Sequence, residues 1–329
     1  MTKYLQFNDE DLHIAGEIVR KGGLVAFPTE TVYGLGANAL DPEAVKSIYV
    51  AKGRPSDNPL IVHIYDKSQL NEIASRISED AEKVVSALMP GSITVVFPKK
   101  SVIDDCVTGG LNTVAVRMPS SKEALAFLKS CNVPVAAPSA NTSTRPSPTT
   151  WQAVKEDMDG RIDALLMGSD CKVGIESTVL DLTGDEPLVL RPGIVTPKEI
   201  SQVLGKPVRV VTNPKEKVNS PGVRYKHYAP RCPMVLNLDG NRDKIRSFYD
   251  KCVKDGYNPV ILTRHPEGYP DCNTCFLGAT DREVAHNLFL LLRRCEKQYD
   301  YIIASYNGDD EVAFSILNRI TKSAGQNIL

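Results

Sequence analysis

The feature that most constrains the fold is a regular alternation of helical segments with short apolar segments that are typical of strands. Residues 8–23 begin with a capping Asn8 or Asp9, carry apolar residues at helical spacing and end in two glycines. The apolar run LVAFPT at 24–29 follows, and the alternation continues along the chain. Helices that alternate with buried strands predict an α/β fold, in which helices cover a sheet.

The pairing of the strands is predicted to be mixed. Helical connections between most of the strands favour parallel pairing, whereas STVLDLTG at 177–184 and PLVLRPG at 187–193 are close enough in sequence to pair antiparallel. We therefore predict a twisted mixed sheet flanked by helices over residues 1–212. The other strands expected in it are 24–29, 60–64, 93–98, 113–119 and 133–139, and the helices are 43–51, 78–89, 122–130 and 196–204.

A second, smaller domain is predicted after a linker, because 329 residues exceed what one hydrophobic core usually supports. Residues 213–233 are rich in Pro, Lys and Asn and have no periodicity, which is typical of a linker. Residues 234–329 contain three strand candidates separated by amphipathic helices. This pattern predicts a small α/β accessory domain with a largely parallel sheet.

Composition and charge exclude several classes of protein. No stretch approaches the roughly 18 apolar residues of a membrane span, and the first residues lack a signal-peptide core, so we expect a cytoplasmic protein without membrane contact. The formal net charge of −1 argues against a surface that binds nucleic acid all over, but leaves room for a local basic cleft. Cys272 and Cys275 form the only CxxC pair, and ordinary reduced thiols are expected there rather than a zinc site.

Two familiar phosphate-binding patterns are absent or unconvincing. No GxxxxGK[ST] motif occurs, which excludes a P-loop enzyme. The GLGANA stretch at 34–39 resembles a dinucleotide fingerprint, but it does not join a strand directly to a helix. We predict instead a glycine-permitted tight loop that lines another kind of pocket.

A stiff basic loop at 52–58 is the first candidate binding segment. Pro55 and Pro59 prevent continuation of the preceding helix. Lys52 and Arg54 carry donors that suit a polyphosphate. Taken by itself, however, the segment fits a solvated basic helix end at least as well.

Further candidates follow strands. The Ser/Thr/Pro-rich segment 136–150 joins a predicted strand to a predicted helix, and its hydroxyls and free amides suit phosphate oxygens. Because ligands of α/β sheets gather at strand ends, these sites are expected to converge. The natural donors in the segment are Ser139, Asn141 and Ser147, and the other strand-end candidates are His63, Arg117, Ser177, Thr178 and Arg191.

Seven motifs in order resemble the threonylcarbamoyl-AMP synthase family of YrdC-like enzymes, and they cover nearly all of the first 210 residues. They are FPTETVYGLGANA at 27–39, IYVAKGRPSDNPLIVHI at 48–64, MPGSITVVF at 89–97, VAVRMP at 114–119, PVAAPSANTS at 134–143, GIESTVLDL at 174–182 and LRPG at 190–193. The SPGVRYKHYAP segment at 220–230 and the domain after it resemble the long, two-domain form of the family.

The resemblance implies a nucleotidyltransferase that joins L-threonine, bicarbonate and ATP into L-threonylcarbamoyladenylate and releases pyrophosphate. Its product would feed the threonylcarbamoyladenosine modification of tRNA, which a separate transferase completes. The resemblance implies Mg²⁺ only as the ion that accompanies ATP, with no dedicated protein ligands.

The resemblance also implies a division of the site residues. Lys52 and Arg54 are expected to be catalytic through their charge. The residues expected at L-threonine are Thr31, His63, Arg117, Ala137 and Ser177. The residues expected at ATP are Lys52, Arg54, Asn58, Thr113, Ser139, Asn141, Ser147 and Arg191, with Tyr225 reaching in from the linker.

One alternative stays open from the sequence. A non-catalytic module that binds RNA or tRNA and acts in translation would use the same basic residues, and weak tRNA contact is also compatible with the enzyme. Binding of RNA would depend on many dispersed cations and fall steeply with salt. Carbamoyl transfer from carbamoyl phosphate is disfavoured, because the zinc-finger and acylphosphatase-like segments of such proteins are absent.

Overall fold

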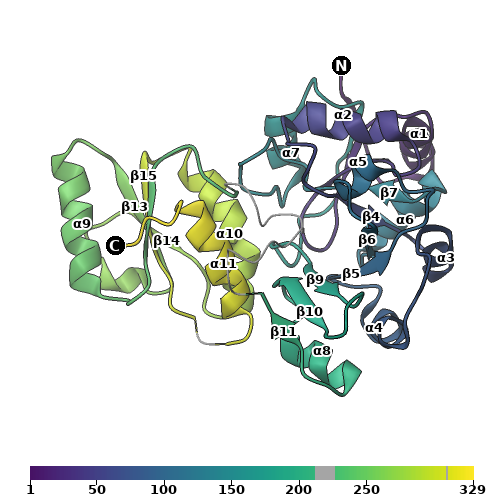
Figure 1. Cartoon of the computed structure of the whole chain (residues 1–329). Helices are drawn as coiled ribbons and strands as arrows, with labels where there is room; N and C mark the ends of the chain where they lie inside the picture. Colours follow the sequence, from purple (N-terminus) through teal and green to yellow (C-terminus); the bar gives the residue numbers. More distant parts are fainter. Residues whose placement is uncertain (212–226, 309) are drawn as a thin grey trace. The chain divides into compact units, whose positions relative to one another are not determined.

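The computed structural model describes residues 1–211, 227–308 and 310–329, which form two compact units (Figure 1). The first unit comprises most of 1–211. The second comprises most of 227–329 together with two short segments from earlier in the chain, Thr144–Ser147 and Val173–Ile175. The predicted linker at 213–233 lies largely outside the described residues, and its boundaries stay a prediction.

The helices predicted at 8–23, 43–51, 78–89, 122–130 and 196–204 are present, and each begins at a side-chain cap. Asn8 accepts a hydrogen bond from the backbone of Asp11, and Asp41 caps the next helix. That second helix ends at Gly53, which has a left-handed φ of 60° and turns the chain into the basic loop. The helices are α1 (Asp9–Arg20), α2 (Pro42–Lys52), α3 (Leu70–Ile73), α4 (Glu79–Leu88), α5 (Asp105–Thr108), α6 (Lys122–Cys131), α7 (Trp151–Met158) and α8 (Pro197–Leu204).

The described part of the first unit contains a mixed sheet of eleven strands in the order β1-β8-β2-β3-β7-β4-β6-β5-β9-β10-β11. The predicted antiparallel pairing of β9 with β10 is confirmed. The strands are β1 (Lys3–Leu5), β2 (Val25–Phe27), β3 (Gly34–Asn38), β4 (Ile61–His63), β5 (Ile93–Pro98), β6 (Thr113–Arg117), β7 (Val135–Ala136), β8 (Ala164–Leu166), β9 (Thr178–Asp181), β10 (Leu188–Arg191) and β11 (Arg209–Val210).

The prediction of a tight glycine loop at 34–39 was wrong. These residues form β3, which pairs antiparallel with β2 on one side and with β7 on the other. Glycine is needed there for packing: a Cβ on Gly36 would lie 2.8 Å from Cγ1 of Val135, and one on Gly34 would lie 3.1 Å from the ring of Phe27. The small residues therefore allow a strand to run through a crowded part of the sheet. They do not show the alternation of apolar and polar residues by which a strand is usually predicted.

The second unit is a small α/β domain with a parallel sheet, as predicted. Its strands run in the order β12-β15-β13-β14, and every pairing is parallel. Figure 1 shows α9 on one face of this sheet and α10 and α11 on the other. The elements are β12 (Met234–Asn237), α9 (Arg242–Lys254), β13 (Pro259–Thr263), β14 (Thr274–Phe276), α10 (Asp281–Cys295), β15 (Tyr301–Ser305) and α11 (Ala313–Ser323).

Two further features of the fold are a short edge strand in the second unit and the limited length of the helices. The edge strand β14 was not predicted, because it is only three residues long and one of them is an exposed phenylalanine. None of the helices in the described parts of the chain is long and apolar enough to cross a membrane.

At Gly16 the backbone of α1 lies so close to α6 that there is no room for a side chain. A Cβ at this position would lie 2.3 Å from the backbone oxygen of Ser130, which also accepts a hydrogen bond from the guanidinium of Arg20. We expect Gly16→Ala to lower the free energy of unfolding by about 1–3 kcal/mol, because the two helices must separate to admit the methyl group. Urea denaturation followed by circular dichroism measures the change.

Gly184→Ala is the matched control, since its added Cβ meets nothing within 4 Å and its φ is not left-handed. We expect this control to alter the free energy of unfolding by less than about 0.5 kcal/mol. Equal effects of the two substitutions would contradict the assigned helix contact.

Candidate functional site

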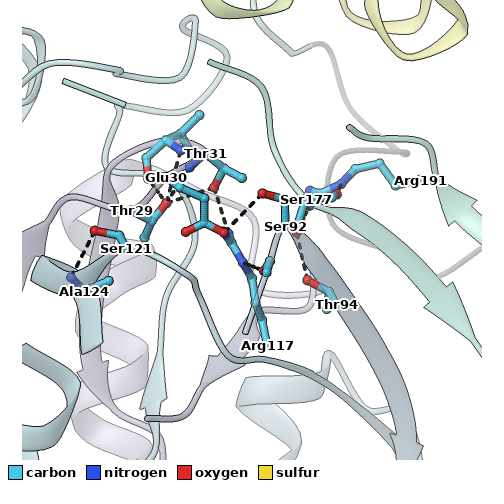
Figure 2. Close-up of polar contacts among 12 residues, drawn as sticks. Thr29, Glu30, Thr31, Ser92, Thr94, Arg117, Ser121, Ala124, Ser177 and Arg191 are labelled. Carbon is cyan, nitrogen blue, oxygen red and sulfur yellow. Dashed lines mark hydrogen bonds and ion pairs between the residues drawn. The ribbon is translucent and has the colours of Figure 1, made fainter. Parts of the chain in front are cut away.

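A buried ion pair joins the end of one strand to the loop that follows another. Arg117 is the last residue of β6, and its Nη2 donates to Oε1 of Glu30 at 2.6 Å (Figure 2). Its Nη1 donates to Oγ1 of Thr31 at 2.8 Å, and its Nε donates to the carbonyl of Gly91 at 3.3 Å. Because all three nitrogens have protein partners, the guanidinium is held in one orientation.

Glu30 is a site residue that the sequence reasoning missed. Its Oε1 also accepts from Oγ of Ser92 at 3.1 Å, whereas its Oε2 is buried and has no hydrogen-bond partner among the described residues. Burial alone would raise the pKa of the carboxyl, but the charge and hydrogen bond of Arg117 lower it overall, helped by the nearby backbone amides of Glu30 and Ser120. Glu30 is therefore ionised at neutral pH. The available signal was that a buried arginine needs a counter-charge, and Glu30 adjoins the predicted Thr31.

Hydroxyl groups line the same region. Oγ1 of Thr31 lies 2.9 Å from Oγ1 of Thr29, and Oγ of Ser177 lies 2.8 Å from Oγ1 of Thr94 (Figure 2). Arg191 donates from Nη2 to the carbonyl of Ser177 at 2.9 Å and to its Oγ at 3.2 Å. The structure thus brings Arg191, expected at the nucleotide, into contact with Ser177, expected at threonine.

His63 is the last residue of β4 and is neutral. Its register partner across the parallel pair is Arg117, and its Nδ1 lies 3.2 Å from the carbonyl oxygen of Ile61. Burial, with the nearby charge of Arg117, lowers the pKa of the imidazole to about 3. A histidine that stays neutral and binds a proton so weakly suits a contact group better than a general base.

Lys52 is the centre of the second half of the candidate site. Its ammonium group donates to the backbone carbonyls of Ser139 and Asn141, and the residue is only 3% exposed. The interpretation as a solvated helix end was therefore wrong, because the cation is turned inward onto the Ser/Thr loop. Arg54 lies nearby in the chain and donates to the carbonyls of Asn58 and Pro59 at 3.4 and 3.3 Å.

The Ser/Thr loop is held by its own side chains and by the neighbouring strand. Oγ of Ser139 donates to Oδ1 of Asn141 at 2.5 Å, and Nδ2 of Asn141 donates to the carbonyl of Thr142 at 2.8 Å. Ser139 also forms an isolated antiparallel bridge with Gly34. Residues 136–143 and 148–150 of the loop belong to the first unit, and Thr144–Ser147 belong to the second. The hydrogen bonds of Ser139 and Asn141 hold the first of these stretches in a defined conformation.

The register of the sheet separates two groups of candidate residues. The basic loop precedes β4, and Thr113 begins β6, whereas His63 and Arg117 end these two parallel strands. At about 3.3 Å per residue, the four steps from Thr113 to Arg117 span about 13 Å. The basic loop and Thr113, which are expected at ATP, therefore lie toward one end of this strand pair, and His63 and Arg117, which are expected at threonine, lie toward the other. Arg191 and Ser177 do not follow this division, because they are in contact.

Three further candidates are Ala137, Ser147 and Tyr225. Ala137 follows β7, and its amide donates to the carbonyl of Ile61 at 2.8 Å, near the start of β4. Ser147 belongs to a segment of the second unit, and Tyr225 lies outside the described residues. Within the described parts of the chain, no group of three or more His, Cys, Asp or Glu side chains is arranged to hold a metal ion.

The neutral state of His63 can be checked directly. We expect the imidazole resonances of His63 to keep their neutral positions from about pH 8 down to about pH 5, because the pKa lies near 3. Two-dimensional ¹H–¹³C NMR of the full chain, assigned with His63→Gln, follows the titration, with the exposed ring of His13 as the reference signal. A midpoint for His63 near 6.5 would contradict the burial of an uncharged ring.

Comparison with protein families assigns both parts of the chain. The Sua5/YciO/YrdC family model, described as telomere recombination, matches residues 17–193. The model described as threonylcarbamoyl-AMP synthase, C-terminal domain, matches residues 195–325.

Comparison with individual proteins covers nearly the whole chain. The threonylcarbamoyl-AMP synthase of Pyrococcus abyssi is 42% identical over 97% of this chain and 95% of its own length, and that of Bacillus subtilis is 40% identical over 100% and 97%. The crystal structure of P. abyssi Sua5 complexed with L-threonine matches with a TM-score of 0.92 at 40% identity, covering 100% of this chain and 99% of that one. The chain belongs to the threonylcarbamoyl-AMP synthase family, in its two-domain form.

Proposed function

We infer that this protein catalyses the formation of L-threonylcarbamoyladenylate and pyrophosphate from L-threonine, bicarbonate and ATP. The observation that carries this proposal is the match at 40–42% identity, over essentially the whole chain, to proteins named threonylcarbamoyl-AMP synthase. A relative solved with L-threonine shares the fold with a TM-score of 0.92. These relatives favour an enzyme over the non-catalytic RNA-binding module.

The threonine end of the proposed site is suited to a zwitterion. Arg117 and Glu30 bring one positive and one negative charge together in a buried environment, and His63 adds none. The carboxylate of threonine would share the guanidinium of Arg117, and the free Oε2 of Glu30 lies in the same group of residues. The hydroxyls of Thr31 and Ser177 would complete the contacts to the carboxylate and side chain, with Ala137 and His63 as the uncharged walls.

The nucleotide end would use the basic loop and the Ser/Thr loop that it orders. Lys52 holds two carbonyls of the Ser/Thr loop, so its charge is fixed in place before any substrate arrives. Arg54 and Arg191 would add further positive charge for the phosphates. Contacts from the hydroxyl and amide groups around them would complete the subsite, from Asn58, Thr113, Ser139, Asn141, Ser147 and Tyr225.

The chemistry requires two anions to meet. The amine of threonine and bicarbonate yield a carbamate and water, and a carbamate oxygen then attacks the α-phosphorus while pyrophosphate leaves. Fixed cations offset the repulsion between the carbamate and the triphosphate and stabilise the charge that grows on pyrophosphate. We therefore assign Lys52 and Arg54 an electrostatic role, and the two ends of the β4–β6 pair a positioning role.

The proposed metal travels with the nucleotide. The described residues offer hydroxyl, amide and carbonyl oxygens near Lys52 but no carboxylate group of the kind that holds a resident ion. Mg²⁺ bound to the triphosphate would supply further charge neutralisation at the leaving group. Ser139 and Asn141 would contact the ion through its waters.

The place of the reaction in tRNA modification is part of the same proposal. The adenylate is a reactive mixed anhydride, so a separate transferase that modifies adenosine in tRNA must consume it. Such a role fits a cytoplasmic enzyme and requires no membrane. Weak tRNA contact would assist the transfer but is not needed for formation of the adenylate.

Arg117→Lys separates binding geometry from charge. Lysine keeps a cation opposite Glu30 but loses the planar fork, so we expect the KM for L-threonine to rise about 10- to 100-fold, as for a lost charge-assisted hydrogen bond of about 1.5–3 kcal/mol. The KM for ATP should change little. Steady-state pyrophosphate release measures both constants, and Arg76→Lys, on the exposed surface, is the matched control. A rise confined to the ATP constant would overturn the assignment of the two ends.

Omission of each substrate tests the reaction itself. We expect pyrophosphate release to require ATP, L-threonine and bicarbonate together, because the carbamate is the nucleophile. L-Serine, which lacks only the methyl group, is the informative replacement for threonine. Mass spectrometry of the quenched reaction should show L-threonylcarbamoyladenylate, which carries the carbon of bicarbonate between threonine and AMP. Pyrophosphate release at an unchanged rate without threonine would refute the proposed function.

A further inference from the structure

Two cysteines of the second unit face each other closely. Cys275 lies in the edge strand β14, and Cys295 is the last residue of α10. Their Sγ atoms are 3.5 Å apart, with the Cys295 thiol donating to the sulfur of Cys275. Twenty residues separate the two positions in sequence, and the CxxC spacing with Cys272 plays no part in the contact.

The pair differs chemically from the other thiols. All eight cysteines lie in described parts of the chain, and Cys275 is the only one whose pKa is lowered. The hydrogen bond from Cys295 is the main cause, opposed by partial burial and assisted by the charge of Arg294. Donation of that hydrogen bond raises the pKa of Cys295. One sulfur is thus favoured as thiolate, with a protonated thiol beside it.

We propose that Cys275 and Cys295 form a reversible thiol-modification site, at which a hydroperoxide oxidises the pair to a disulfide. In the first step the Cys275 thiolate attacks the peroxide, which yields the sulfenic acid of Cys275 and, from hydrogen peroxide, water after protonation. In the second step Cys295 attacks the sulfur of Cys275, the S–S bond forms, and a second water leaves. Two thiols lose two electrons in total, and hydrogen peroxide is reduced to two waters.

The surroundings of the pair permit this chemistry. Cys275 is partly exposed and can meet a small oxidant, whereas Cys295 is only 1% exposed and is reached through its partner. To form a bond of about 2.05 Å, the sulfurs must approach by about 1.5 Å. The approach can come from β14, because this strand pairs on one side only and ends in an exposed residue, Phe276.

Oxidation would also act on a neighbouring ion pair. Glu296 follows Cys295 directly, and its carboxylate accepts two hydrogen bonds from the guanidinium of Arg145 and one from the backbone amide of Arg231. Arg145 belongs to the segment Thr144–Ser147. A disulfide that pulls on the end of α10 would therefore disturb the anchoring of this segment.

The test uses the full-length protein and hydrogen peroxide, without any substrate, so its outcome does not depend on the proposed function. After oxidation and blocking of free thiols, peptide mapping without reductant should yield a linked pair of peptides that contain Cys275 and Cys295. Dithiothreitol should separate them. Cys295→Ser should accumulate a sulfenic acid at Cys275, trapped by dimedone, and Cys275→Ser should protect Cys295.

Cys232→Ser is the matched control, because Cys232 is another partly exposed thiol of the second unit. The linked peptides should form at the wild-type rate in this variant. Absence of the linked peptides in the wild type, or dimedone labelling of Cys275 no faster than that of Cys272 in Cys295→Ser, would overturn the proposal. Hydrogen exchange at 144–147 should become faster on oxidation, and an unchanged rate there would refute the link to Arg145.

Discussion

The buried pair of Arg117 and Glu30 is the interaction on which the candidate site depends. Removing either partner would leave an uncompensated charge in the interior, which typically costs about 3–5 kcal/mol. The pair also connects distant parts of the chain, since Arg117 ends β6, Glu30 follows β2, and Gly91 precedes β5. The geometry around Arg117, where we propose that threonine binds, is therefore a property of the folded sheet.

Lys52 follows the same physical logic at the nucleotide end. A cation that holds backbone carbonyls gives up some freedom, but it orders the loop that would face the phosphates. At both ends of the proposed site charge fixes the protein, and the same charges would then meet the substrate. In such a design a substitution changes local structure and binding together, which is why charge-conserving variants are the informative ones.

The sequence predicted what local patterns determine. Capping residues and apolar periodicity predicted α1 and α2, and the short separation in sequence predicted that β9 pairs with β10. Each of these features depends on residues that are neighbours in the chain. The strand β3 was missed because its glycines are chosen for packing against other strands and carry no alternating pattern. Glu30 and the inward turn of Lys52 were missed for a related reason, since a counter-charge or a carbonyl partner comes from far along the chain. The family resemblance predicted which residues belong at ATP and which at threonine. The register of β4 and β6 then showed that Thr113 and Arg117 lie at opposite ends of one strand.

The second unit includes two segments from the earlier part of the chain, and this affects how experiments on shortened chains can be interpreted. Thr144–Ser147 and Val173–Ile175 belong to that unit although both precede residue 212, and Gly174 approaches His286 so closely that a Cβ would lie 2.4 Å from its backbone. A shortened chain that stops at 212 would keep both segments but lose the surface that covers them. Loss of activity in such a chain would not show that the second unit takes part in catalysis. Point substitutions that leave both segments covered are the sounder way to ask what that unit does.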